Sequence, residues 1–275
     1  MMRVAYQRYR SVACRGILSR HVDVWVPPQY AAQPAQRFPV LYMHDGQNLF
    51  DPELAYTGVT WGIAEAMERI DRSSTIRPAI VVGIWNSPNR FGDYQPLKPF
   101  ATPLGSIKRA LSHLHPQARH TRYVADAYLD CLVHSVKPMI DRDYRTLPDP
   151  GHTMVMGSSM GGLISLYALC EYPEIFGGAG CLSTHWPVVQ PEMFRYLRNN
   201  LPNPGKHRLY FDRGTAGLDR RYRRGQQQMD RLAEDFGYRE GRDYLSLVFE
   251  GHDHSERSWS SRIDRPLEFL LSAQS

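Results

Sequence analysis

The chain has 275 residues, of which 42% are hydrophobic and 22% are charged, so it is long enough to bury the core of one α/β domain. Its 33 basic and 28 acidic residues give a net charge of +5, which favours anionic substrates only weakly and does not indicate a nucleic-acid-binding protein. The sequence contains no run of about 18 apolar residues that could cross a membrane.

The N-terminal region lacks the apolar core of a secretory signal, because Arg3, Arg8, Arg10 and Arg15 interrupt it. We therefore expect a cytoplasmic protein whose residues 1–275 form one domain, and the sequence leaves its oligomeric state open. The four cysteines, at positions 14, 131, 170 and 181, show no C-x-x-C spacing. We expect them to be buried free thiols, and we expect no metal site.

Apolar runs alternate with stretches of helical periodicity along the chain. The runs predict strands at residues 21–26, 40–43, 79–84, 153–156, 178–182, 208–211 and 244–249, and the periodic stretches predict helices at 62–69, 124–140, 161–171, 221–236 and 266–272. This alternation predicts an α/β fold with a mainly parallel sheet, whose first strands are antiparallel at one edge. Ligands of such sheets bind at the carboxyl ends of the strands.

The segment at residues 95–121 interrupts this alternation. It has no strand pattern, a short helix is expected at 107–114, and its prolines and basic side chains are Pro96, Pro99, Pro103, Pro116, Lys98, Lys108, Arg109, His113, His115, Arg119 and His120. The segment is long for a plain connection. Two interpretations stay open, namely a lid or pocket wall over the active site and a solvated excursion of the chain.

A strand-to-helix turn at residues 157–161 predicts a catalytic serine. Its sequence, Gly-Ser-Ser-Met-Gly, fits the pattern G-x-S-x-G with Ser159 at the centre. In the nucleophile elbow of α/β-hydrolases the sharp turn needs small residues two positions before and after the serine, and Gly157 and Gly161 supply them. The alternative is a glycine-rich connection with an incidental serine.

A serine nucleophile of this kind needs an acid and a histidine that follow it in the chain. The glycine-rich loop after the strand at 208–211 offers Asp212 and Asp219. We prefer Asp219, because a carboxylate beside a strand end more often caps a turn. The loop after the last strand offers His252 and His254, which their chemistry alone does not separate.

Several segments together resemble the putative-esterase branch of the α/β-hydrolases, which includes enterochelin-type, feruloyl and acetyl-xylan esterases and S-formylglutathione hydrolase. These segments are residues 39–51, 80–84 with Asn86 and Arg90, 144–146, 157–162, and 251–256 with Trp259. The resemblance covers nearly the whole chain and implies an α/β-hydrolase fold, with a mainly parallel central sheet and helices on both faces. The family's terminal pattern G-x-x-H-x-E falls on Gly251, His254 and Glu256, which implies that His254 is the base.

Two backbone N–H groups are expected to form the oxyanion hole. Met160 directly follows the nucleophile at the start of a helix, whose dipole favours developing negative charge. In the resembled enzymes a residue after a D/H-G pair supplies the second donor, which implies Gln47 first and Gly46 second. We expect Asp45 to hold this loop through hydrogen bonds.

Three further residues, Trp85, His185 and Trp186, directly follow predicted strands. They are candidates to line a substrate cleft, and burial in the core is the alternative for the aromatic rings.

Together these features predict a serine esterase. Ser159 attacks a carboxylic ester, His254 accepts its proton, Asp219 stabilises the imidazolium, and water releases the acid from an acyl-enzyme. The expected partner is a small-molecule ester, with no cofactor, no nucleic acid and no membrane. The alternatives are an acyltransferase that uses the same triad and a catalytically silent ligand-binding paralogue. The natural ester, whether a siderophore, an acylated sugar or a short-chain ester, stays open.

Overall fold

The computed structural model describes residues 4–71, 76–102, 121–188 and 191–272. Residues 103–120 lie outside this range, and with them the expected helix at 107–114 and most of the segment 95–121. The described start of that segment forms a short 3-10 helix, Lys98–Phe100, which packs against α8 (Glu192–Asn200) and buries Phe100 in the core.

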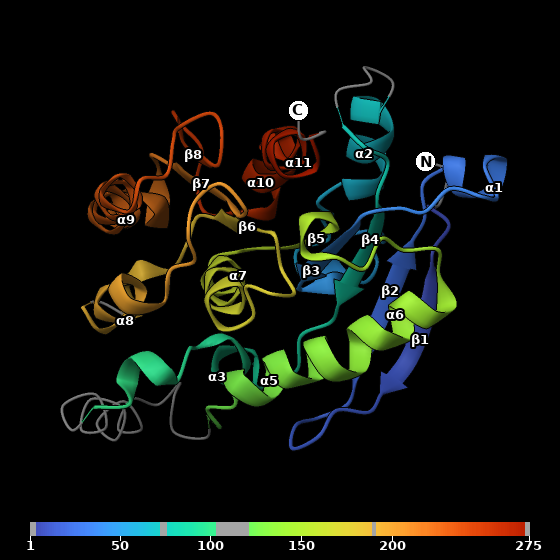
Figure 1. The fold of residues 1–275 in the computed structure, drawn as a ribbon, viewed down its shortest axis with the longest axis horizontal. Coiled ribbons are helices and arrows are strands. Elements are labelled where there is room, and N and C mark those ends of the chain that lie inside the picture. The colour runs from blue at the N-terminus through green and yellow to red at the C-terminus, as the bar shows by residue number, and fades with distance from the viewer. Residues whose placement is uncertain (1–3, 72–75, 103–120, 189–190, 273–275) are drawn as a thin grey trace.

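The centre of the fold is an eight-stranded sheet in the order β1-β2-β4-β3-β5-β6-β7-β8 (Figure 1). The strands are β1 (Gln7–Val12), β2 (Arg20–Trp25), β3 (Val40–His44), β4 (Ile80–Ile84), β5 (Thr153–Ser158), β6 (Gly178–Leu182), β7 (Arg208–Gly214) and β8 (Tyr244–Phe249). β1 and β2 are antiparallel to their neighbours, and the other pairs are parallel. The predicted fold, a mainly parallel sheet with an antiparallel edge, is confirmed.

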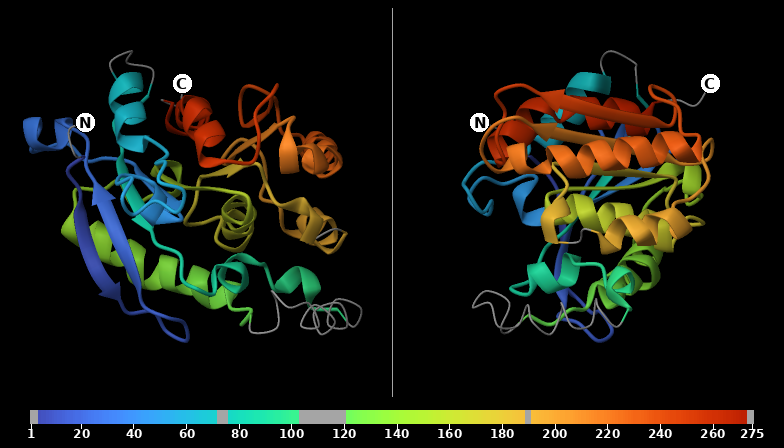
Figure 2. Two further views of the ribbon diagram at one scale, coloured as in Figure 1. Left: turned by 180° about the vertical axis from the view of Figure 1, so that it is seen from behind. Right: turned by 90° about the vertical axis from the view of Figure 1, so that its left-hand side faces the viewer.

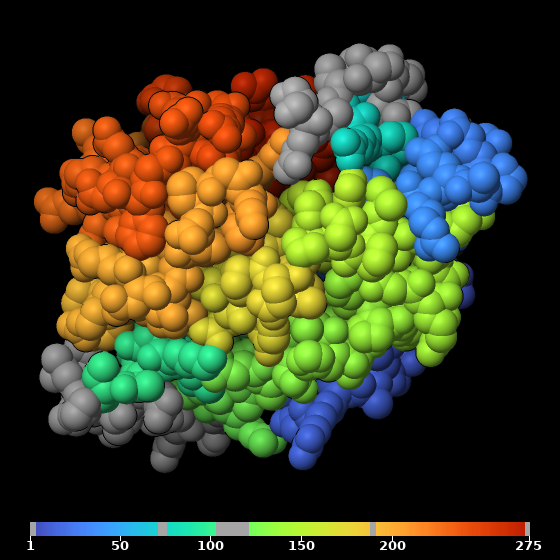
Figure 3. Space-filling view, viewed as in Figure 1, coloured from blue at the N-terminus to red at the C-terminus, as the bar shows by residue number. Residues whose placement is uncertain are grey.

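Helices cover both faces of the sheet (Figure 2). One face carries α5 (Ala125–Cys131), a π-helical stretch (Leu132–Val136), α6 (Lys137–Asp143), α7 (Met160–Glu171), α8 and α9 (Arg223–Phe236), and the other carries α2 (Ile63–Asp71), α10 (Glu256–Arg262) and α11 (Asp264–Leu271). Figure 3 shows the segments coloured lime, yellow and orange side by side on one surface of the molecule. The short helices α1 (Gln29–Ala32) and α3 (Arg90–Tyr94) lie in connections.

Two hydrophobic cores follow from this layering, one on each face of the sheet. All residues of β3, β4, β5 and β6 are buried, as expected for parallel strands covered on both sides. Helix α7 is buried from its first residue to Cys170, and it packs on β5 and β6. The core therefore fixes the start of α7 directly above the end of β5.

The N-terminal edge differs from the sequence-based expectation. Strand β1 has a partly exposed, arginine-rich sequence, QRYRSV, which gave no apolar run to recognise and suits a protected sheet edge. Cys14 and Cys131 form a disulfide, so the expectation of four free thiols is wrong for these two residues. Their separation of 117 residues hides the pairing, because only the packing of the chain after β1 against α5 brings them together. Cys170 and Cys181 are free and buried, as expected.

This disulfide closes a long loop, so its reduction should destabilise the fold by about 2–4 kcal/mol. Non-reduced, denatured protein should react with two equivalents of a thiol reagent, and reduced protein with four. Denaturant unfolding with and without reductant measures the loss of stability. Four reactive thiols without reductant would contradict the pairing, whereas an oxidised bond in protein taken from its native cells would contradict the expected cytoplasmic location.

Candidate active site

Ser159 occupies a strained turn between β5 and α7. Its backbone angles, φ 57° and ψ −119°, are rare for a residue with a side chain. The turn needs glycine at position 157, because a Cβ there would lie 2.8 Å from the backbone carbonyl carbon of Gly161, whereas a Cβ on Gly161 would make ordinary contacts at 3.5 Å. The Ser159 N–H donates to the Leu182 carbonyl at 2.8 Å, and the Ser159 carbonyl accepts from His185 N–H at 3.2 Å. These bonds hold the strained conformation and place Ser159 at the carboxyl edge of the sheet.

Asp219 and His254 meet at the same edge. Asp219 belongs to a 3-10 helix (Gly217–Tyr222) after β7, and His254 lies on the loop between β8 and α10. The His254 Nδ1–H donates to Asp219 Oδ1 at 2.6 Å, while Asp219 Oδ2 accepts from Gly214 N–H at 2.7 Å and from the Ser183 hydroxyl at 2.6 Å.

The hydrogen bonds of Asp219 decide its charge. Burial would raise the pKa of this carboxyl group, but the bonds from His254, Ser183 and Gly214 outweigh burial and hold the pKa below its ordinary value. An ionised carboxylate only accepts hydrogen bonds, so the facing His254 nitrogen, Nδ1, carries the hydrogen. Neutral His254 therefore presents Nε2 as a proton acceptor.

The alternative acid, Asp212, forms its side-chain hydrogen bonds with Arg262 and Tyr210. Its Oδ1 accepts from Arg262 Nη2 at 2.9 Å and its Oδ2 accepts from the Tyr210 hydroxyl at 3.0 Å. Among the described residues no hydrogen bond joins Asp212 to a histidine. The competing base, His252, has its ring against Phe249 with centroids 5.5 Å apart. Geometry therefore favours Asp219 and His254 over both alternatives.

Sequence reasoning missed two residues that contact Asp219. Ser183, with φ 43°, donates its hydroxyl to Asp219 and accepts from Trp259 Nε1 at 3.0 Å and from Arg262 Nη2 at 2.8 Å. Arg262 is buried and also lies 3.8 Å from Asp219 Oδ2. A serine after a strand and an arginine on a C-terminal helix carry no local signal of this role, because the contacts form only when α10 packs beneath the sheet edge.

The loop after β3 brings a second set of N–H groups to the sheet edge. Asp45 has left-handed angles, φ 57° and ψ 44°, and a 3-10 helix (Gly46–Asn48) follows it. Within this helix, the Asn48 N–H is the first to donate to a carbonyl earlier in the chain, that of Asp45, at 2.9 Å. The N–H of Gln47 lies in the first turn of this 3-10 helix, and the N–H of Met160 lies in the first turn of α7. N–H groups in a first turn have no carbonyl acceptor within their own helix.

This loop packs tightly against β4. A Cβ on Gly46 would lie 2.4 Å from the carbonyl carbon of Gly83, so the position requires glycine. The side-chain oxygen of Gln47 accepts from Asn86 N–H at 3.2 Å. Backbone approach and side-chain bonding together fix the loop relative to the end of β4.

Asp45 ties the loop to α3, and it makes the hydrogen bonds expected of it. Arg90 donates from Nε and Nη2 to its two carboxylate oxygens, each at 2.7 Å, and Asn86 Nδ2 donates to Oδ1 at 2.7 Å. Burial alone would raise the pKa of Asp45, but the charge and hydrogen bonds of Arg90 and the Asn86 amide hold the pKa below its ordinary value.

The three residues expected to line the cleft lie in different surroundings. Trp186 is buried in the core, stacked on Phe194 with centroids 5.2 Å apart, so a substrate-binding role is wrong for it. Trp85 donates from Nε1 to Asp23 at 2.8 Å, and its ring therefore faces β2. Of the three, His185 lies beside Ser159, because its backbone N–H donates to the Ser159 carbonyl at 3.2 Å. Its Nδ1 lies 2.6 Å from the hydroxyl of Tyr222, a residue that sequence reasoning did not select.

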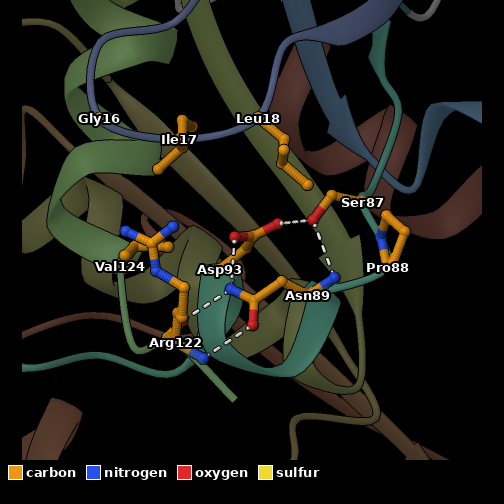
Figure 4. A pocket seen from close by; sticks show the side chains of 9 residues that line it. All are labelled: Gly16, Ile17, Leu18, Ser87, Pro88, Asn89, Asp93, Arg122 and Val124. Carbon is orange, nitrogen blue, oxygen red and sulfur yellow. Dashed lines mark hydrogen bonds between the residues drawn. The ribbon is translucent and has the colours of Figure 1, made fainter. Parts of the chain in front are cut away.

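A cavity of about 260 Å³ lies between the β4–α3 connection and the chain that joins β1 to β2. It is lined by residues 16–18, residues 87–89, Asp93, Arg122 and Val124. Figure 4 shows Asp93 among the residues that line the cavity, where it accepts from the Ser87 hydroxyl at 2.5 Å and from Asn89 Nδ2 at 3.1 Å. Arg20 pairs with the same carboxylate at 3.2 Å. These polar groups bond to one another and support α3, so we assign the cavity no ligand.

Among the described residues, no group of three or more His, Cys, Asp or Glu side chains is placed to hold a metal ion. No helix in the same part of the chain is long and apolar enough to cross a membrane.

A strained serine at a strand-to-helix turn, on a mainly parallel sheet covered by helices, defines an α/β-hydrolase. The family described as "Putative esterase" matches residues 18–270. The chain belongs to this family, and it is an ester hydrolase.

Individual relatives are distant but extend over most of the chain. Uncharacterized protein YbbA of Bacillus subtilis is 23% identical over 260 residues, which cover 92% of each chain. An IroE-like serine hydrolase from Shewanella oneidensis superposes with a TM-score of 0.72 at 21% identity, over 97% of this chain and 80% of the other. The enterobactin esterase FES from Shigella flexneri, in the presence of enterobactin, gives a TM-score of 0.69 at 16% identity, over 97% of this chain and 59% of that longer chain. These structures share the fold.

The ion pair of Asp45 with Arg90 should contribute stability that depends on pH. Arg90→Ala leaves a buried carboxylate without its cation, and because the Arg90 side chain is 34% exposed we expect a loss of about 2 kcal/mol at pH 7. A depressed pKa in the folded state means that this contribution is present above the unfolded pKa and is lost as the pH falls through the folded pKa of Asp45.

Urea unfolding of both proteins at pH 7 and in acid measures this difference. Arg69→Ala, which removes a more exposed pair with Asp264, is the matched control and should cost much less. A difference for Arg90→Ala that stays constant down to strongly acid pH would contradict the assignment.

Proposed function

We propose that the protein hydrolyses carboxylic esters with Ser159 as nucleophile, His254 as general base and Asp219 as the acid that orients His254. The observation that carries this proposal is the 2.6 Å bond between His254 Nδ1 and a buried, ionised Asp219, formed at the sheet edge that holds the strained Ser159. An acid, a base and a partly exposed serine at one edge are the parts that acyl transfer requires.

In the first half of the reaction the Ser159 Oγ attacks the ester carbonyl carbon while His254 Nε2 takes its proton. The positive charge that develops on His254 is stabilised by Asp219 at Nδ1. The tetrahedral intermediate collapses, His254 gives its proton to the leaving alcohol, and the acyl group stays on Ser159. Water repeats the sequence in the second half and releases the acid.

The N–H groups of Met160 and Gln47 are the proposed oxyanion hole. Both lie in the first turn of a helix, where backbone N–H groups point outward and the helix dipole favours negative charge. The Asp45 and Gly46 contacts keep the second helix in place, so the donors need little reorganisation when charge develops.

The substrate is proposed to be a small ester. Enterobactin esterase and ferulic acid esterase are among the proteins that share this fold, so aryl and lactone esters belong in a first panel beside acylated sugars and short-chain esters. A screen of acyl length and alcohol type with purified protein would rank these classes.

The triad is tested by paired substitutions. Ser159→Ala and His254→Ala should each reduce the hydrolysis of p-nitrophenyl acetate by at least about a thousandfold, and the double variant should lose no more, because the two residues act as a unit. Ser158→Ala and His252→Ala are the matched controls and should keep most of the activity. Retention of more than about a hundredth of the rate by Ser159→Ala would contradict the assignment.

The two acids give a separate test. Asp219→Asn removes the charge that orients His254 and should lower kcat by about 10³–10⁴-fold. Asp212→Asn should chiefly lower the free energy of unfolding, because the buried Arg262 then lacks a negatively charged partner. Rates are compared per folded molecule, from thermal unfolding of each variant. A larger loss of kcat in Asp212→Asn would reverse the assignment.

A further inference from the structure

Two buried tyrosines contact the chain that leads into the proposed oxyanion hole. His44 ends β3, and Asp45 precedes the 3-10 helix that carries the Gln47 N–H. The Asp45 N–H donates to the hydroxyl of Tyr94 at 3.2 Å. The hydroxyl of Tyr128 lies 2.6 Å from His44 Nδ1. The proposed mechanism gives neither hydroxyl a role.

The protonation states fix the direction of the bond between Tyr128 and His44. Burial is the main cause that lowers the pKa of His44 to about 3, so the ring is neutral at pH 7 and carries one hydrogen. Burial also raises the pKa values of Tyr94 and Tyr128, so both phenols stay protonated. The distance of 2.6 Å is short for an N–H donor and suits an O–H donor, so Tyr128 donates to His44 Nδ1.

This bond is the one that fixes the His44 ring. The hydrogen of the ring is on Nε2, and among the described residues this buried nitrogen has no hydrogen-bond partner. The rings of His44, Tyr94 and Tyr128 pack against one another with centroids 5.2 to 5.5 Å apart, and each is at most 1% exposed. Water therefore cannot replace a lost partner, and removal of either hydroxyl leaves a buried polar group unsatisfied.

Asp45 needs support because its backbone conformation is unfavourable. A residue with a side chain keeps left-handed angles, here φ 57°, only where the surrounding structure holds them. Helix α3 contacts Asp45 twice, because Arg90 pairs with the carboxylate and Tyr94 accepts from the N–H. The direction of the Gln47 N–H follows from the backbone angles of Asp45 and Gly46, so these contacts also set the direction of that donor.

Tyr128 is itself fixed by a buried charge. The guanidinium of Arg20, at the start of β2, lies 4.9 Å from the centroid of the Tyr128 ring, a cation–π contact. Arg20 is 3% exposed, and it pairs with Asp93 of α3 at 3.2 Å. The cluster therefore joins β2, α3 and α5 to the end of β3, and the core determines its position.

We propose that Tyr94 and Tyr128 are positioning residues of the oxyanion hole, which fix Asp45 and His44 and so direct the Gln47 N–H towards the developing oxyanion. Neither hydroxyl touches the substrate, since both side chains are buried. Their effect is preorganisation, because a donor that is already directed needs no reorganisation when charge develops. The ester carbonyl of the ground state carries less charge, so a misdirected donor should lower kcat more than it changes KM. This inference rests on the proposed esterase mechanism.

The test compares p-nitrophenyl acetate with p-nitrophenyl thionoacetate in Tyr94→Phe. The thionoester has sulfur in place of the carbonyl oxygen, and sulfur is a weak hydrogen-bond acceptor, so the hole assists it little. We expect kcat for the ester to fall about tenfold with KM within about twofold, because a displaced donor costs less than the 10²–10³-fold of a deleted one. The rate for the thionoester should stay within about threefold, so the ratio of ester to thionoester rates should fall.

Tyr128→Phe tests the second tyrosine. This residue acts on the chain through the His44 ring, so the ratio should fall in the same direction but by only about threefold. Tyr42→Phe is the matched control, because Tyr42 is a fully buried phenol on the same strand as His44 and its hydroxyl has no hydrogen-bond partner among the described residues. Both rates of this control should be unchanged. Thermal unfolding of each variant allows rates to be compared per folded molecule.

The outcomes separate the inference from the mechanism on which it rests. Equal losses for ester and thionoester in Tyr94→Phe would show that Tyr94 only supports the fold, and this result or unchanged rates would overturn the inference alone. Wild-type protein that prefers the ester no more than uncatalysed hydrolysis does would overturn the oxyanion hole, and the inference with it. Wild-type protein that forms no acyl-enzyme on Ser159, by mass spectrometry, would overturn the proposed esterase mechanism.

Discussion

Two buried carboxylates, Asp212 on β7 and Asp219 on the 3-10 helix after it, share the contacts of Arg262, and the site depends on how their charges are compensated. Asp212 and Asp219 are both fully buried, and a buried charge without a partner costs several kcal/mol. Arg262 pairs with Asp212 at 2.9 Å and stands farther from Asp219, at 3.8 Å. The charge of Asp219 is instead compensated by hydrogen bonds from Ser183, Gly214 and His254, so Asp219 can stabilise an imidazolium. Asp212, through Arg262, holds α10 against the sheet.

The sheet register brings the remaining parts to this edge. Ser158 pairs with Leu182 and Leu182 pairs with Asp212, so β5 and β6 end at the same level, beside Asp212 of β7. The chain turns sharply after β5, at Ser159, and after β6, at Ser183, and both residues have positive φ. Strain at these turns is offset by the burial of α7, whose packing leaves little freedom to relax. The same rigidity places His185 beside Ser159, whose carbonyl accepts from the His185 N–H.

Much of this arrangement could be predicted from local sequence, because periodicity and turn chemistry are local. The β6 and β8 ranges agree with the structure, and the glycines of 157–161 identify the elbow. Long-range contacts left no such signal. Ser183 and Arg262 look ordinary in sequence, and their hydrogen bonds to Asp219 and Asp212 form only where separate elements meet. Trp186 shows the converse, because a position after a strand does not reveal whether a ring points to the cleft or into the core.

The division between the two carboxylates can be observed directly by NMR of protein with ¹⁵N-labelled histidine. A strongly deshielded proton should be bonded to His254 Nδ1, since that hydrogen lies in a short, charge-assisted bond to Asp219. The signal should persist in folded Asp212→Asn and be lost or shifted far upfield in folded Asp219→Asn. A signal that survives unchanged in Asp219→Asn, or is absent from wild type, would contradict the pairing on which the proposed chemistry depends.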